Sequence, residues 1–131
     1  MQSLNMRFLF YSHDGLGLGH TRRNLAIAAA LTELAPEASV LLATGADYVS
    51  RLGLPPHVDI LKLPGLRKVS NGEYSSRHLR IPVPEIRSLR AELLLTAIKS
   101  YFPSVVLVDK HPFGAGGEFR VGLETLRRLG G

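Results

Sequence analysis

Two glycine-rich loops carry the strongest chemical signal in this sequence. The first, HDGLGLGH, spans residues 13–20, and the second, DKHPFGAGG, spans residues 109–117. Glycine lets backbone amides approach an anion closely, and a helix that starts after the loop directs its positive end to the same point. Either loop alone could be an ordinary turn after a strand. Together they predict a phosphate-binding site, with Gly15, Gly17 and Gly19 of the first loop as candidate glycines.

Two cations follow the first loop directly. Arg22 and Arg23 fall in the first turn of the expected helix, where a positive charge opposes the helix dipole and costs about 0.3–1 kcal/mol. An anionic ligand would offset that cost, and so would an acidic neighbour such as Asp14, Asp109 or Glu118. The two explanations are compatible, and the first makes both arginines candidates for phosphate or substrate binding.

His20 stands at the junction of loop and helix. An imidazole titrates near neutral pH, so His20 is a candidate general base, and the alternative is a histidine that only hydrogen-bonds the loop. No metal centre is expected, because the chain has no cysteine and its potential ligands follow no known metal-site spacing. Those potential ligands are His13, Asp14, His20, Asp109 and His111.

Two common nucleotide-binding motifs are excluded. A dinucleotide fingerprint starting at Gly15 would need glycine where His20 stands, and an acid at the end of the second strand, which reads Ala43-Thr44-Gly45. A P-loop would need Gly-Lys-Ser/Thr after the glycines, and none follows. A nicotinamide-dependent oxidoreductase is therefore disfavoured.

The elements that position these loops follow from the apolar pattern. Unalternating apolar runs indicate strands buried on both faces of a parallel sheet, with helices on either side. We expect a Rossmann-like, doubly wound α/β domain of strand order 3-2-1-4, so that both glycine-rich loops lie at the carboxyl edge where the order reverses. The expected strands are 7–12, 39–44, 58–63 and 104–108, and the expected helices are 21–34, 46–52, 84–102 and 118–129.

A long segment, 66–83, shows no apolar periodicity and is expected to be irregular. It has one acid, Glu73, against five basic residues, Arg67, Lys68, Arg77, His78 and Arg80. Such a segment is either a solvated loop or one that recognises an acceptor with phosphate groups or a membrane surface. Its single aromatic residue, Tyr74, argues against stacking on single-stranded nucleic acid.

Composition limits the remaining choices. The chain has 131 residues, of which 45% are hydrophobic, and a formal net charge of +5. That length predicts one globular domain, residues 1–131. No apolar run approaches the roughly 20 residues of a membrane helix, and no signal peptide is evident, so we expect a cytoplasmic protein with peripheral membrane contact as an option.

The stretch FYSHDGLGLGHTRRNLAIAAAL resembles the amino-terminal strand, loop and helix of predicted glycosyltransferases of the GT-B fold, a group loosely related to the peptidoglycan N-acetylglucosaminyltransferases. LKLPGLRKVSNGEY, RAELLL and VVLVDKHPFGAGGEF resemble the same family. The resemblance implies two Rossmann-like domains flanking a cleft, with the acceptor on the first, the nucleotide sugar mainly on the second, and no obligatory metal. The family's glycine-rich loops carry over to Gly15, Gly17, Gly19 and His20, and to Asp109, Lys110, Pro112, Gly114 and Glu118.

The resemblance implies that this chain is the acceptor-side half of such a transferase, inactive without its carboxyl-terminal donor domain. The donor would be a nucleotide sugar of the UDP-hexose type, and the acceptor a small molecule or a glycolipid. No other cofactor and no nucleic-acid partner are expected. The alternative function is a non-catalytic basic α/β module that binds an anionic partner.

Overall fold

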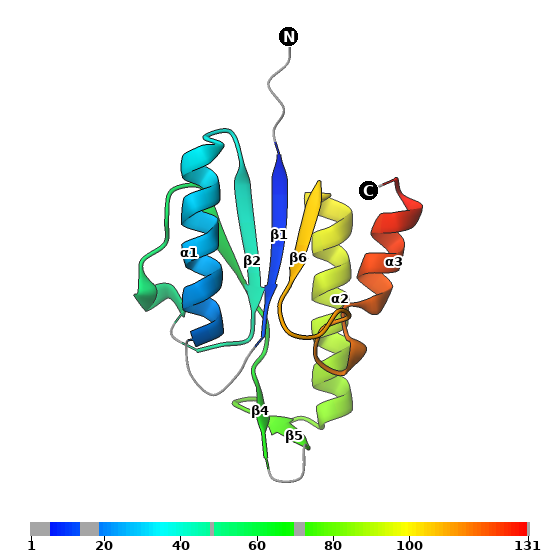
Figure 1. Ribbon diagram of the computed structural model, residues 1–131. Helices are drawn as coiled ribbons and strands as arrows, with labels where there is room; N and C mark the ends of the chain where they lie inside the picture. The colour runs from blue at the N-terminus through cyan, green and yellow to red at the C-terminus, as the bar shows by residue number, and fades with distance from the viewer. Residues whose placement is uncertain (1–5, 14–18, 48, 70–72, 131) are drawn as a thin grey trace.

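A computed structural model describes residues 6–13, 19–47, 49–69 and 73–130. Its main feature is a four-stranded parallel sheet of order β3-β2-β1-β6 (Figure 1). The strands are β1 (Arg7–Ser12), β2 (Ser39–Thr44), β3 (Val58–Lys62) and β6 (Val105–Val108). The predicted fold class and strand order are therefore confirmed.

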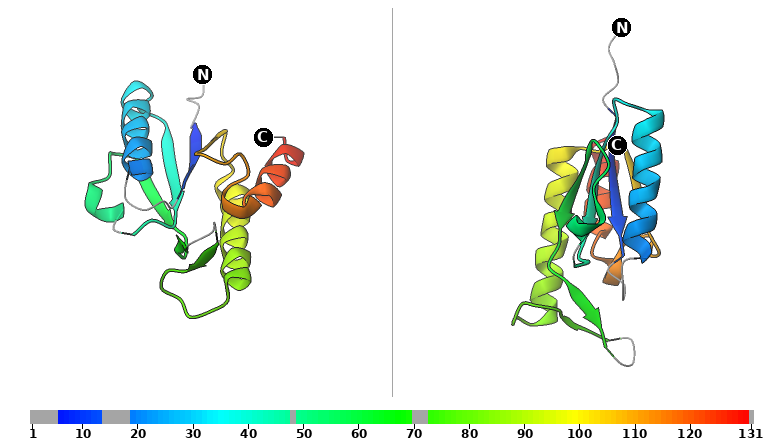
Figure 2. Two further views of the ribbon diagram at one scale, coloured as in Figure 1. Left: turned by 60° about the horizontal axis from the view of Figure 1, so that its bottom comes forward. Right: turned by 90° about the vertical axis from the view of Figure 1, so that its left-hand side faces the viewer.

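Helices cover both faces of this sheet. Helix α1 (Gly19–Leu34) packs on one face, and α2 (Val83–Tyr101) and α3 (Arg120–Arg128) pack on the opposite face (Figure 2). The central strand β1 supplies both cores, because its successive side chains point to opposite faces. The core under α2 and α3 contains Leu9, Tyr11, Ala43, Leu63, Leu94, Ile98, Phe119 and Leu126. The core under α1 contains Phe10, Leu25, Ala28, Val40, Leu42, Val49 and Val58.

The topology brings the two loops after β1 and β6 together. The chain runs outward from β1 to β3, and α2 then carries it back to β6 on the other side of β1. Both strands run in the same direction, with Tyr11 opposite Val108, and the Asp109 amide donates to the Tyr11 carbonyl at 3.0 Å. The described parts of both loops thus lie at one edge, as expected, whereas Gly15 and Gly17 fall outside the described residues.

Two local expectations need correction. Segment 66–83 is not wholly irregular, because β4 (Leu66–Lys68) and β5 (Tyr74–Ser76) pair as an antiparallel hairpin. Burial of Leu66 and the position of the Arg87 guanidinium, 5.1 Å from the Tyr74 ring centre, explain the order there. The short helix expected at 46–52 is only a 3₁₀ turn, η1 (Val49–Leu52).

Candidate functional site

Asp109 joins the two loops at the carboxyl edge of the sheet. Its Oδ2 lies 2.8 Å from Nδ1 of His20, and its Oδ1 accepts a hydrogen bond of 3.0 Å from Arg23. Asp109 is largely covered, with 12% of its side chain exposed, whereas 33% of the His20 side chain is exposed. One carboxylate therefore holds both His20 and Arg23, which confirms the predicted acidic neighbour for one arginine.

The contact with Asp109 orients the His20 ring. Nδ1 has two neighbours, the Asp109 carboxylate and Nη2 of Arg23 at 3.1 Å. A neutral ring that accepts from Arg23 carries its proton on Nε2, whereas a ring that donates to Asp109 carries it on Nδ1. The contact between Asp109 Oδ2 and Nδ1 is not aligned as a hydrogen bond. With its proton on Nδ1, the ring is a base held by an acid, and Nε2 has a lone pair that can take a proton.

Two further imidazoles lie beside this pair. The buried ring of His13 stands edge-on to His20, with ring centres 5.5 Å apart, and edge-on to His111 at 5.7 Å. At the sequence level, His13 and His111 were considered only as potential metal ligands, and their spacing did not support that role. The His, Asp and Glu side chains within the described ranges form no group of three or more that could hold a metal ion.

The second glycine-rich loop has a backbone that favours glycine. Gly114 has φ +77° and ψ 175°, and a Cβ there would lie 3.1 Å from Cζ of Tyr11. Gly116 and Gly117 also have positive φ, and so does Lys110, at 71°. Lys110 is exposed next to Asp109. This loop places a cation and a close-packed backbone beside the His20–Asp109 pair.

Glu118 is buried under that loop. Its two carboxylate oxygens accept hydrogen bonds of 2.7 Å each from Nε and Nη2 of Arg90, and Tyr11 donates its hydroxyl to the same carboxylate. Arg90 also donates to the Pro64 carbonyl at 2.7 Å. Burial raises the pKa of the Tyr11 phenol well above its usual value, and the Glu118 carboxylate raises it further. The carboxylate that the resemblance placed among the ligand contacts thus serves as an anchor inside the protein.

Arg90 and Tyr11 were missed at the sequence level. Both side chains are almost fully buried, at 1% exposure each. Arg90 lies four residues after Ile86 and four before Leu94, on the buried side of α2. A cation in the middle of an apolar stripe needs a buried acid, and that position was the available signal.

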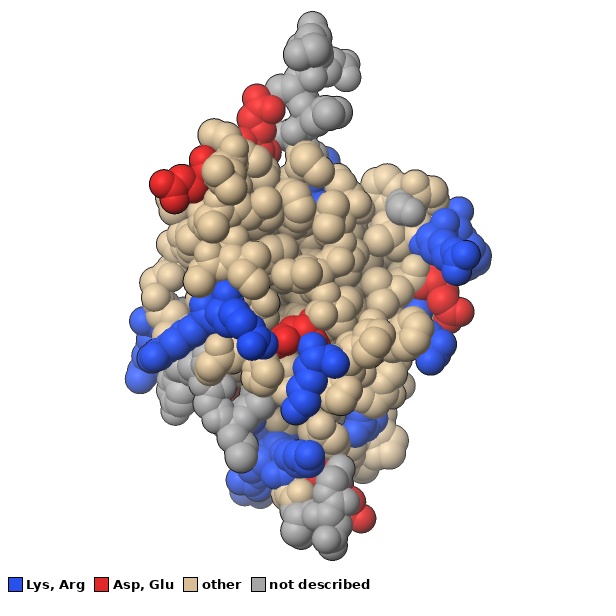
Figure 3. Space-filling model, viewed as in Figure 1, with Lys and Arg blue, Asp and Glu red and all other residues tan. Residues whose placement is uncertain are grey.

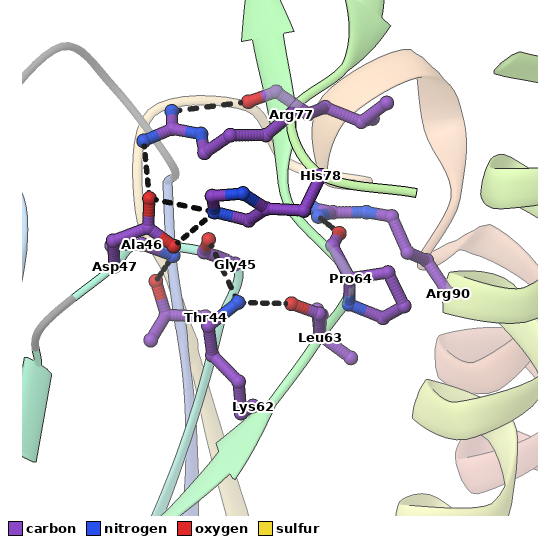
Figure 4. A network of polar contacts seen from close by, with 11 residues as sticks. Thr44, Gly45, Ala46, Asp47, Lys62, Leu63, Pro64, Arg77, His78 and Arg90 are labelled. Atoms are coloured by element: carbon purple, nitrogen blue, oxygen red, sulfur yellow. Dashed lines mark hydrogen bonds and ion pairs between the residues drawn. The ribbon is translucent and has the colours of Figure 1, made fainter. Parts of the chain in front are cut away.

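Asp47 organises a second polar network at the same edge (Figure 4). His78 Nε2 lies 3.0 Å from both carboxylate oxygens, and Arg77 donates to Oδ2 at 3.4 Å and to the Leu66 carbonyl at 3.2 Å. Burial alone would raise the pKa of Asp47, but hydrogen bonds and charge from His78 and Arg77 outweigh it and lower that pKa. Two of the basic residues of segment 66–83 therefore tie that segment to the loop after β2.

The charges are distributed unevenly over the molecule. On the face seen in Figure 3, Lys and Arg gather around the lower end of α1 and the carboxyl edge of the sheet, whereas acidic side chains lie near the other end of α1. Arg22 does not join the His20–Asp109 pair but lines a separate hollow beside η1. No described helix is long and apolar enough to cross a membrane.

The chain matches no protein-family model and no curated protein. Its fold is similar to that of a UGT transferase from Siraitia grosvenorii, solved in complex with UDP. The TM-score is 0.54 at 15% sequence identity, and the match covers 95% of this chain and 26% of that one. The chain thus spans 26% of that protein's length, and the likeness shows a Rossmann-like fold.

Proposed function

We propose that this chain is the acceptor-side domain of a GT-B glycosyltransferase and that His20 is its general base. The observation that carries the proposal is the His20–Asp109 pair, in which Nδ1 lies 2.8 Å from Oδ2. It lies at the carboxyl edge where the sheet order reverses, which is where doubly wound sheets bind their ligands. The proposed relation to peptidoglycan N-acetylglucosaminyltransferases rests on the sequence resemblance alone.

In the proposed reaction, Asp109 keeps the proton of His20 on Nδ1, and Nε2 takes the proton of an acceptor hydroxyl. The hydroxyl oxygen then forms a bond to the anomeric carbon of the donor sugar. The bond from that carbon to the donor diphosphate breaks, and its electron pair leaves with the nucleoside diphosphate. General-base assistance of this kind contributes about 10²–10⁴-fold in rate.

The departing diphosphate gains negative charge, and we assign its stabilisation to the loops around the base. Lys110 is exposed beside Asp109, and the positive end of α1 begins at Gly19. Gly15 and Gly17 of the first loop would let backbone amides approach the phosphates. Gly114 instead donates its amide to the His111 carbonyl and packs against Tyr11, so it would shape the second loop. Glu118 would act through Arg90 and Tyr11 as a positioning residue that holds the second loop.

The donor we propose is a UDP-hexose, acting as co-substrate without any further cofactor. The support is the similar solved protein, which holds UDP. Because this chain spans only 26% of that protein, the donor domain would be supplied by another part of the same polypeptide or by a partner chain. The acceptor would be a small molecule or a glycolipid that reaches the exposed side of His20.

One observation favours a second function, a non-catalytic module for an anionic partner. Arginine and lysine gather at the carboxyl edge (Figure 3), and a binding module would need only that charge. The two functions differ in what they require of His20. A base must be an imidazole at this position, whereas a binding module would tolerate a neutral substitute.

The test is His20→Ala in the enzyme completed by its donor domain, with a UDP-hexose as donor. We expect turnover to fall about 10²–10⁴-fold, because the base is lost. The melting temperature should change little, because a partly exposed side chain contributes little to the core. His78→Ala is the control, since His78 also pairs with a carboxylate at this edge, that of Asp47. Equal turnover in the His20 variant and the wild type would contradict the transferase proposal.

A further inference from the structure

Two adjacent arginines of α1 point to different surroundings. Arg23 donates to Asp109 and belongs to the site described above. Arg22 lies one residue, or about 100° of helical rotation, away. It lines a hollow on the side of α1 that faces η1, together with Arg51. The sequence made both arginines candidates for phosphate or substrate binding, whereas the structure places them at two different sites.

The hollow lies between one turn of α1 and the segment that follows β2. Its lining residues are Arg22, Leu25, Ala26, Arg51, Leu52, Gly53 and Pro55. It is open-sided and has a volume of about 490 Å³, which falls within the range of about 300–1,000 Å³ typical of small-molecule sites. Two arginines thus share the lining of the hollow with the apolar residues Leu25, Leu52 and Pro55.

Arg22 is unfavourably placed for the stability of α1. A cation in the first turn opposes the helix dipole, and no carboxylate within the described ranges forms an ion pair with Arg22. Arg23, in the same turn, has Asp109 as its partner. Among the described residues nothing offsets this cost to Arg22, and an anion in the hollow would remove it.

We propose that this hollow is a second anion-binding site, which takes the phosphate group of a phosphorylated ligand. A phosphate monoester carries about −1.5 to −2 charges at neutral pH, so it suits two cations better than a carboxylate does. A guanidinium can donate two parallel hydrogen bonds to phosphate oxygens, which we assign to Arg22, with Arg51 adding a second positive charge. The apolar lining residues would contact the carbon atoms next to the phosphate.

This site is distinct from the proposed transferase centre. It involves Arg22 and Arg51 in place of Arg23, Asp109 and His20, and it requires no sugar transfer. A phosphate monoester has two sources, a free phosphorylated molecule or the headgroup of phosphatidic acid. Both would present the same group to the two arginines, so the test includes an arm for each.

The first arm titrates the 131-residue chain with glycerol 3-phosphate, a phosphate monoester, and follows backbone amide resonances. We expect Ala26 and Gly53 in the wall of the hollow to shift. Arg22→Ala and Arg51→Ala should each weaken this binding about tenfold, the effect of losing one charge-assisted hydrogen bond. Arg22→Lys should restore only part of it, because lysine lacks the planar fork. Arg127→Ala removes an equal charge from an exposed position on α3 and should leave the affinity unchanged.

The second arm measures co-sedimentation with phosphatidic acid vesicles, with phosphatidylcholine vesicles as the reference. Loss of lipid binding in the Arg22 and Arg51 variants, but not in Arg127→Ala, would support the site with a headgroup as its source. Asp109→Asn should leave the shifts of Ala26 and Gly53 intact, which separates this proposal from the transferase centre. If neither arm detects binding, or if Arg127→Ala weakens binding as much as Arg22→Ala does, the proposal is wrong.

Discussion

The Asp109 carboxylate lies 2.8 Å from the His20 imidazole, although one residue follows the first strand of the sheet and the other follows the last. Only the reversal of strand order at β1 brings these two loops together. The same carboxylate also binds Arg23, so that a histidine, an acid and an arginine from two distant segments meet at one edge. Four predictions follow from this arrangement and from the anchors beneath it.

Replacing Asp109 by Asn should change the tautomer of His20 without unfolding the domain. The amide can present its NH₂ group to Nδ1, which favours the proton on Nε2 and leaves no lone pair there for a base. Two-bond ¹⁵N–¹H correlation spectra of the imidazole would detect the exchange. Asp47→Asn, at the other network of this edge, should leave the His20 spectrum unchanged. An unaltered His20 tautomer in Asp109→Asn would show that the carboxylate does not orient the ring.

Replacing Glu118 by Gln should destabilise the domain by about 3–5 kcal/mol, because Arg90 would remain buried without a countercharge. Both oxygens of Glu118 accept from Arg90 at 2.7 Å, and an amide can offer only one of them. Urea denaturation would measure the change in the free energy of unfolding. Glu124→Gln, at an exposed position of α3, is the matched control and should stay within about 0.5 kcal/mol of the wild type.

Replacing Gly114 by Ala should cost more than replacing Gly53 by Ala. Both glycines have φ +77°, so both variants strain the backbone, but only a Cβ at Gly114 meets neighbours, with Tyr11 Cζ at 3.1 Å. The crowding should add about 1–3 kcal/mol to the loss of stability. Thermal melting of the two variants would measure the difference. Equal losses would mean that the Tyr11 ring moves aside freely.

Asp47 should make the stability of the domain depend on pH in the acid range. Its pKa is lowered in the folded protein, so its contribution is complete above the unfolded value, about 3.9, and is lost as the pH falls through the lowered pKa. The difference in melting temperature between the wild type and Asp47→Asn should therefore be constant from pH 5 to about pH 4 and should shrink below that.

His78→Ala provides the check on this last prediction. This variant removes His78, one of the two hydrogen-bonding partners that lower the Asp47 pKa. In a protein that carries His78→Ala, the difference in melting temperature caused by adding Asp47→Asn should therefore change less with pH. If the difference between wild type and Asp47→Asn persists unchanged down to the lowest pH, the carboxylate is not the group that titrates.

Much of this protein could be predicted from the sequence alone. Unalternating apolar runs at 7–12 and 39–44 can be satisfied only by a sheet that is covered on both faces. The right-handed crossover rule then leaves the observed strand order, which brings His20 and Asp109 to one edge. These features follow from short-range patterns that do not depend on the details of packing.

The tertiary structure alone decided which partner each polar side chain has. Arg22 and Arg23 are adjacent and chemically identical, yet helical rotation and the position of Asp109 allow only Arg23 to bind that carboxylate. The residue type of Glu118 does not distinguish it from an exposed acid, but in the folded protein Arg90 and Tyr11 bind its carboxylate inside the core. Such pairings join residues from distant segments, and their energy depends on distance and burial, which exist only once the chain has folded.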